Sequence, residues 1–213
     1  FSGSDNCGMA VYAVHAGKTS RHAKFKLSSS VSNFTTVESD IYDLYDATNW
    51  NLALVFEPKN DQRNLPAGTQ SDYWARLIGY QVESGQTINS FNISSSVGSG
   101  SALSMSAENK RVFIGAERQN FTGSLLYTSQ ARFGNCKFYA DSLEEEEVRL
   151  HAAYKNSEGR LRPFENANRK NDNDTLYVPQ YLTTLLHWDF EQVTTPDVYG
   201  QFLAKDITSA SLN

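Results

Sequence analysis

Apolar and polar residues alternate along much of the chain between residues 9 and 140. The pattern is clearest in "WNLALVFE", where Trp50, Leu52, Leu54 and Phe56 occupy every second position. Successive side chains of a strand point to opposite faces of the sheet, so these four residues are expected to share one face. The segment is therefore predicted to be a strand with one buried face.

A second segment, "YWARLIGYQV", alternates in the same way and places Trp74, Ile78, Tyr80 and Val82 on one side of the pleat. A connection rich in Pro, Gly and Asp separates it from the first strand. Further strands are expected at "AVYAVH", "AKFKL", "TINSFNIS", "KRVFIGA" and "ARFGNCKFYA". Short strands at this regular spacing predict an all-β fold, an antiparallel β-sandwich.

One segment, "DSLEEEEVRLHAAY", departs from the alternation. Ser142 is followed three residues later by Glu145, as in a capping box, and acidic residues fill the first turn, where the helix dipole favours them. A short helix is predicted over about 143–154. The alternative of a metal cluster is disfavoured, because consecutive helical residues point roughly 100° apart and do not converge on one ion.

Residues 155–184 have little periodicity and many Asn, Lys, Arg and Asp residues, which predicts a linker or a surface arm. Alternation returns at "LLHWDFEQV", where Leu186, Trp188 and Phe190 share one face. A turn at "TPDVYG" and a second short strand, "QFLAKD", follow. Residues 185–213 are therefore predicted to form a β-hairpin.

Composition and charge narrow the choice of partners. The net charge of −5, with a sequence pI near 5.4, provides no basic stripe that would bind a phosphate backbone, so nucleic acid is not an expected partner. No apolar run reaches about 18 residues, so membrane insertion is not expected. The chain begins at Phe1 without a signal-peptide pattern, which suggests a processed chain or a fragment.

Two cysteines, Cys7 and Cys136, permit at most one disulfide. Either the two are bridged or both are free thiols. The strand pattern around Cys136 favours the free form, because a buried free Cys behaves as a small apolar residue. The redox environment of the protein stays open.

Several motifs together resemble the laminin-G-like, concanavalin A-type jelly-roll family. In that family a Trp opens a central strand, an "IGA" strand precedes a Gly turn, and a helix with paired glutamates ends in an apolar pair. Trp50, residues 114–116, Gly123 and residues 143–152 match this pattern, and the resemblance covers residues 48–152. It implies a jelly roll formed by residues 1–154, and it identifies a fold far better than a function.

The closing segment, "HWDFEQV" to "YGQFLAKDITS", resembles the first strand and turn of the same domain. Either the chain continues into the start of a next repeat, or the hairpin completes its own sandwich. The combination is most similar to tandem repeats in large virion structural proteins of tailed phages that infect marine bacteria. This implies a location in a virion or outside cells, with neighbouring repeats or subunits as partners. Trp50, Leu186, Trp188 and Phe190 are the expected structural and assembly residues.

The segment "VESDIYD" is the one enzyme-like pattern, because family-16 glucanases place Glu-x-Asp-x-x-Glu on a strand of this fold. Glu38 and Asp40 would share a face. Asp43, however, lies an odd number of positions from Asp40, and its side chain is one methylene shorter than the Glu of that family. The chain is therefore predicted to be non-catalytic.

The same segment raises the question of a metal. Asp40, Asp43 and Asp46 would supply oxygen ligands to calcium, as some laminin-G-like domains do at the edge of the sandwich. The spacing lacks the Gly and the terminal Glu of an EF-hand loop. Calcium is thus a weak candidate, and no other cofactor is expected.

Four tyrosines are candidate ligand-binding residues: Tyr42, Tyr45, Tyr73 and Tyr80. Exposed aromatic rings at a sandwich edge would stack on sugar rings. The alternative, cross-strand packing, is favoured because aromatic residues in strands usually serve that purpose.

Two functional hypotheses follow. The first is a non-catalytic structural or adhesive module of a virion or other extracellular assembly, one unit of a tandem repeat. The second is a carbohydrate-binding module that recognises a surface glycan through the loops at 59–72 or 94–110.

Overall fold

The computed structural model describes residues 8–30, 34–45, 49–60, 71–107, 112–118, 124–129, 131–154, 168–169, 177–178, 184–193, 195 and 204–208. The chain divides into two compact units, Phe1–Ala131 and Arg132–Asn213. This division comes earlier than residue 154, where the sequence placed the end of the sandwich. The strand that carries Cys136 and the helix after it therefore belong with the C-terminal hairpin.

The first unit is built mainly of strands. Its elements are β1 (Met9–His15), β2 (His22–Ser29), β3 (Val37–Asp43), β4 (Asn49–Pro58), β5 (Tyr73–Glu83), β6 (Gln86–Val97), α1 (Ser99–Ala107), β7 (Ala116–Arg118) and β8 (Leu125–Thr128). The second unit contains β9 (Cys136–Tyr139), α2 (Glu145–Ala153), β10 (Asn168–Arg169), β11 (Tyr177–Val178), β12 (Thr184–Val193) and β13 (Ala204–Asp206).

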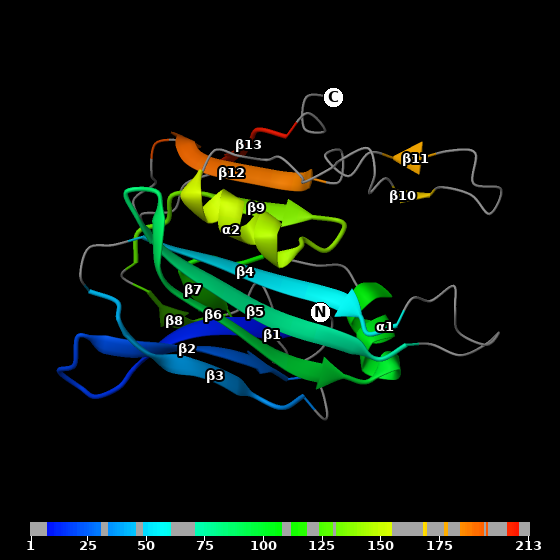
Figure 1. Ribbon diagram of the computed structural model, residues 1–213, viewed down its shortest axis with the longest axis horizontal. Coiled ribbons are helices and arrows are strands. Elements are labelled where there is room, and N and C mark those ends of the chain that lie inside the picture. Colours follow the sequence, from blue (N-terminus) through cyan, green and yellow to red (C-terminus); the bar gives the residue numbers. More distant parts are fainter. Residues whose placement is uncertain are drawn as a thin grey trace. The chain divides into compact units, whose positions relative to one another are not determined.

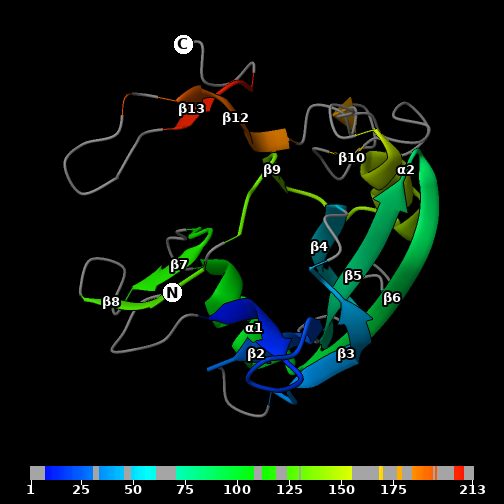
Figure 2. The same ribbon diagram turned by 90° about the vertical axis from the view of Figure 1, so that its left-hand side faces the viewer.

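Two antiparallel three-stranded sheets, β1-β2-β3 and β4-β5-β6, form the first unit together with the hairpin β7-β8 (Figures 1 and 2). The predicted all-β antiparallel sandwich is thereby confirmed. Strands within each sheet follow one another in sequence order. The jelly-roll topology that the resemblance implies stays a prediction.

The core lies between the two sheets. Phe25 and Leu27 of β2 pack in one cluster with residues of β5, β6 and α1: Ala75, Leu77, Val97, Ala102 and Met105. Side chains from both sheets meet there, as expected of a sandwich whose inner faces interdigitate. Full burial of a side chain of the size of Leu27 contributes about 2 kcal/mol to folding.

The predicted buried face of β4 is only partly correct. Trp50 and Phe56 pack against the core cluster, whereas Leu52 and Leu54 on the same face are 40% and 44% exposed. Val55, on the opposite face, is 4% exposed. β4 is an edge strand of its sheet, and its inward face is less completely covered than that of the central strand β5, where Ala75 and Leu77 are fully buried.

In β5 both faces are buried. Ile78 and Tyr80 are buried on the predicted face, but Trp74 on that face is 37% exposed. Ala75 and Leu77 on the opposite face belong to the core. β5 is the central strand of its sheet, with β4 and β6 paired along its two edges.

Helix α1 lies within the segment that the sequence predicts to be a loop, 94–110. The sequence "SGSALSMSA" is dominated by Ser and Gly, which favour turns over helices. The helix begins where the Asp72 carboxylate accepts the Ser99 N–H at 3.0 Å, one of the donors that a helix start leaves without an internal partner. Burial of Ala102 and Met105 in the core then stabilises it.

The predicted helix near 143–154 is confirmed as α2, but the predicted N-cap residue is wrong. The N-cap is Glu144 rather than Ser142, and Glu147 Oε2 accepts the Glu144 N–H at 2.8 Å. Glu147 is 1% exposed, and its buried carboxylate is hydrogen-bonded to this backbone N–H at the start of the helix. The Ser142 N–H instead donates to Asp141 Oδ1 at 2.9 Å.

In the second unit β12 is the centre of a sheet with the order β13-β12-β9. The predicted hairpin is present, because β12 pairs antiparallel with β13. β12 also pairs with β9, placing Leu186 opposite Phe138 and Trp188 opposite Cys136. Within the predicted linker 155–184, the described residues include the short antiparallel pair of β10 and β11.

Candidate functional site

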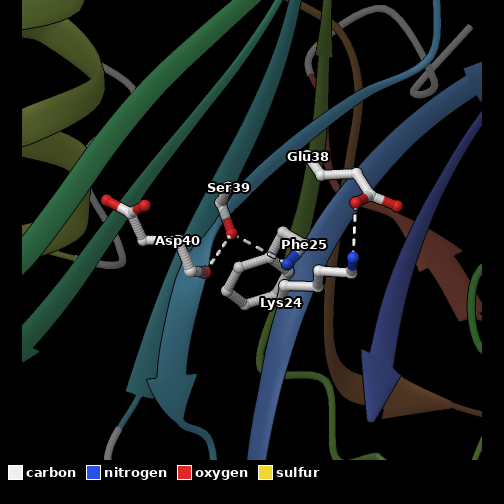
Figure 3. Close-up of polar contacts among 5 residues, drawn as sticks. All are labelled: Lys24, Phe25, Glu38, Ser39 and Asp40. Carbon is white, nitrogen blue, oxygen red and sulfur yellow. Dashed lines mark hydrogen bonds and ion pairs between the residues drawn. The ribbon is translucent and has the colours of Figure 1, made fainter. Parts of the chain in front are cut away.

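The acidic segment of β3 contains a β-bulge. Lys24 lies opposite Ile41 and Lys26 lies opposite Glu38, so both Ser39 and Asp40 face Phe25. Ser39 is buried, and its hydroxyl oxygen accepts the Phe25 N–H at 2.9 Å and donates to the Asp40 carbonyl at 2.7 Å (Figure 3). The Ser39 side chain thus takes the place of a missing backbone bond of the ladder.

The bulge separates the carboxylates of the enzyme-like pattern. Glu38 forms an ion pair with Lys24, whose hydrogen bond lowers the pKa of that carboxyl, and Figure 3 shows the Asp40 carboxylate pointing away from this pair. Asp43 pairs with Arg21 at 2.9 Å. Glycoside hydrolysis needs two carboxylates that flank one bond, whereas Glu38 and Asp43 are each paired with a cationic side chain, Lys24 and Arg21.

The geometry of the same residues does not favour the calcium hypothesis. Both oxygens of Asp43 have partners, since Oδ2 pairs with Arg21 and Oδ1 accepts the Tyr45 N–H at 3.1 Å. Asp46 lies outside the described residues. Across the part of the chain that the structure describes, no group of three or more His, Cys, Asp or Glu residues is placed to hold a metal.

Three of the four candidate tyrosines pack inside the fold. Tyr42 contacts the Trp50 ring, with centroids 4.9 Å apart, and its burial, together with the charge of Asp40, raises the pKa of its phenol. Tyr73 stacks on Phe56 at 4.8 Å, and Tyr80 is 6% exposed. The four do not form one platform.

Tyr45 differs from the other three because it is 58% exposed. Its ring stacks on His15 with centroids 5.2 Å apart and planes 19° from parallel. The Tyr45 hydroxyl lies 2.7 Å from His15 Nε2, and His15 Nδ1 lies 3.2 Å from the Ser20 carbonyl oxygen. A carbonyl only accepts, so Nδ1 carries a proton, and in the neutral imidazole Nε2 accepts from the Tyr45 hydroxyl.

An ion pair is joined to the backbone of Tyr45. Arg21 and Asp43 meet at 2.9 Å, and Asp43 also accepts the Tyr45 N–H. The Leu44 N–H donates to the Arg21 carbonyl at 3.3 Å, which ties the end of β3 to the loop between β1 and β2. We call His15, Arg21, Asp43 and Tyr45 together the Tyr45 surface.

The loop that carries Arg21 is held by its own hydrogen bonds. The Ala16 N–H donates to the His22 carbonyl at 2.9 Å, the Ser20 N–H to the Gly17 carbonyl at 3.1 Å, and the His22 N–H to Ser20 Oγ at 3.0 Å. Neither His15 nor Arg21 is a site residue that the sequence predicts. The turn composition of "HAGKTSR" between two strands was the available signal for a hairpin that brings them together.

The expected assembly residues fall into two environments. Trp50 is a core residue, with its ring 5.0 Å from that of Phe25 and 5.9 Å from that of Phe91. Trp188 and Phe190 lie on β12 with ring centroids 6.4 Å apart, and both are partly exposed. Their strand is irregular: the register shifts after Trp188, and Phe190 has a φ of 56°, which bulky residues rarely adopt.

The C-terminal sheet has one face turned toward α2, because Tyr139 stacks on His151 with centroids 6.0 Å apart. Leu186 and Phe138 are cross-strand neighbours, and strand alternation places Phe138 on the face opposite Tyr139. Phe138 is 39% exposed, and Leu186 is partly exposed. An apolar patch of Phe138, Leu186 and Trp188 thus lies on the face away from α2; we call it the β12 patch.

Cys136 is a free, half-buried thiol, and burial raises its pKa. This agrees with the free-thiol interpretation for that residue. Cys7 lies outside the described residues.

The described residues include no helix long and apolar enough to cross a membrane. No protein-family model, curated protein or solved structure matches the chain. The laminin-G-like resemblance and the similarity to phage repeats therefore stay predictions.

Proposed function

We propose that the chain is a non-catalytic structural or adhesive module of a virion or other extracellular assembly, repeated in tandem. The observation that carries the proposal is the β12 patch, in which Phe138 is 39% exposed and Leu186 and Trp188 are partly exposed. Apolar side chains gathered on one exposed face mark interaction surfaces. The partner is a neighbouring repeat or subunit of the same assembly.

The energetics of such a contact are substantial. Complete burial of each of these apolar side chains is worth roughly 2 kcal/mol relative to full exposure. Because the three side chains are already partly buried, contact with a partner adds a fraction of that amount. Phe138 comes from β9 and the other two from β12, and antiparallel pairing holds them in register. A patch fixed by a sheet loses little freedom when a partner covers it.

Sedimentation velocity tests the proposal, because neighbours in a tandem array carry the same surfaces as a second copy of this chain. We expect concentration-dependent association of the wild type and a clear loss of it in Leu186→Asp. Leu52→Asp is the matched control, since Leu52 is an exposed strand leucine outside the β12 patch. A wild type that stays monomeric at high concentration would oppose the proposal, and so would equal loss in both variants.

The second candidate function is binding of a surface glycan, and the exposed Tyr45 ring supports it. A glycan array probed with the intact chain tests this function independently of self-association. Reproducible binding to a defined set of glycans would support it, and a uniformly blank array would count against it.

A further inference from the structure

The Tyr45 ring is exposed and yet held in place. One ring face stacks on His15, while 58% of the residue is exposed, so the other ring face is open to solvent. The hydroxyl is bonded to His15 and the backbone N–H to Asp43. A ring ordered before binding adds contact area at a small entropic cost.

The ion pair that accepts the Tyr45 backbone N–H supplies both donors and acceptors. The Arg21 side chain is 65% exposed and that of Asp43 is 33% exposed. A guanidinium has five N–H donors, of which Arg21 uses only some in its pair with Asp43. Each carboxylate oxygen has two lone pairs, so Asp43 retains acceptor capacity beyond its bonds to Arg21 and the Tyr45 N–H.

An open aromatic ring and an ion pair joined to the backbone of the same residue together select the class of ligand. A pyranose presents C–H groups on one face of its ring and hydroxyls, each both donor and acceptor, around its rim. A stacked nucleobase would bring phosphates toward Asp43 in a chain of net charge −5, which is unfavourable. Arg21 and Asp43 neutralise each other, so the pair offers no excess positive charge to an acidic sugar.

We infer that the Tyr45 surface binds a neutral pyranose, with the ring of the sugar stacked on Tyr45 and adjacent hydroxyls bonded to Arg21 and Asp43. This inference rests on the second candidate function and adds to it the place and the chemical class of the ligand. His15 is a positioning residue, because it fixes the ring and its hydroxyl.

Titration of the intact chain with neutral oligosaccharides identified on a glycan array, followed by NMR, tests the inference. We expect shifts of the His15 and Tyr45 resonances and about tenfold weaker binding in Tyr45→Ala, which corresponds to about 1.4 kcal/mol. Tyr45→Phe should keep most of the affinity, because the ring remains. Tyr154→Ala is the matched control, since Tyr154 is 69% exposed in the other unit.

Three results would overturn the inference. Neutral glycans that bind equally to wild type and Tyr45→Ala would leave glycan binding intact but move the site elsewhere. A blank array would remove the site and the second candidate function together. Preference for acidic glycans would contradict the assigned ligand class. If Tyr45→Ala unfolds, Arg21→Ala at an exposed position replaces it, with the same loss of affinity expected.

Discussion

The aromatic ring of Phe91 on β6 lies directly over Gly79 of β5, its cross-strand partner. A Cβ added at Gly79 would lie 2.2 Å from Phe91 Cε1. The same ring stacks on Phe25 at 5.3 Å and on Tyr42 at 5.9 Å, so it fills the space between the two sheets. The absence of a side chain at Gly79 is what admits the ring.

Gly79→Ala should therefore destabilise the first unit by about 2 kcal/mol, in the range of core overpacking. Urea unfolding followed by tryptophan fluorescence measures the change. Gly100→Ala is the control, because nothing lies within 4 Å of a Cβ at that helical position and Ala favours helix. Equal stability of the wild type and Gly79→Ala would show that the Phe91 ring moves aside freely.

Ser39→Ala should remove the acceptor that the bulge provides for the Phe25 N–H. Ser39 is 8% exposed, so the N–H would be left without its partner in a buried place, at a cost of roughly 1–3 kcal/mol. Hydrogen exchange of the Phe25 amide is the most direct measurement, and the exchange should be faster in the variant than in the wild type. Ser94→Ala, at an exposed position on β6, should change neither quantity. Unchanged protection of the Phe25 amide would refute the role of Ser39.

The two-residue turn between β5 and β6 should respond to substitution in opposite directions. Ser84 and Gly85 have φ values of 50° and 79°, as a type I′ turn requires at both central positions. Ser84→Asn, which tolerates this region better, should raise the melting temperature slightly. Gly85→Ala should cost about 1–2 kcal/mol because of the Cβ clash in the left-handed region. Equal melting temperatures for both variants would argue against this turn.

Asp206 makes the stability of the second unit depend on pH in the acidic range. Burial alone would raise the pKa of its carboxyl, but hydrogen bonds from the backbone N–H groups of His187 and Thr208, each 3.0 Å long, outweigh burial and lower it. A carboxyl with a lowered folded pKa stabilises the fold above its ordinary value of 3.8 and loses that contribution as pH falls through the folded value.

Urea midpoints at pH 7, 5 and 3 measure this effect. The contribution of Asp206 to the midpoint should be nearly the same at pH 7 and pH 5. Between pH 5 and pH 3 that contribution should decrease, so the midpoint should fall. In Asp206→Asn the fall should be smaller, because the charged group is absent. An identical pH dependence in the variant would show that other carboxyls, such as Glu38 and Glu146 with their lowered pKa values, dominate the acid response.

Local pattern alone was enough for several elements. The alternation in "WNLALVFE" and "YWARLIGYQV" predicted β4 and β5, and the acidic start of "EEEEVRLHAA" predicted α2. These properties depend on neighbours along the chain: side-chain alternation in a strand, and favourable charge at a helix start. The all-β class followed from the same source.

Other features required contacts between segments far apart in sequence. Helix α1 depends on Asp72 and on burial of Met105, neither of which its own sequence reveals. The exposure of Leu52 and Leu54 depends on which strands face β4. Strand alternation identifies residues that share a face, but only the facing sheet decides how much of that face is covered.

The Tyr45 surface shows the same division. The sequence alone made Tyr45 a candidate together with Tyr42, Tyr73 and Tyr80, since all four are aromatic residues in or beside predicted strands. Tertiary structure placed three of them among packed side chains and left Tyr45 exposed beside His15. Periodicity depends on neighbours along one strand, whereas a binding surface is assembled by pairing between strands and by the packing that covers three of these four tyrosine rings.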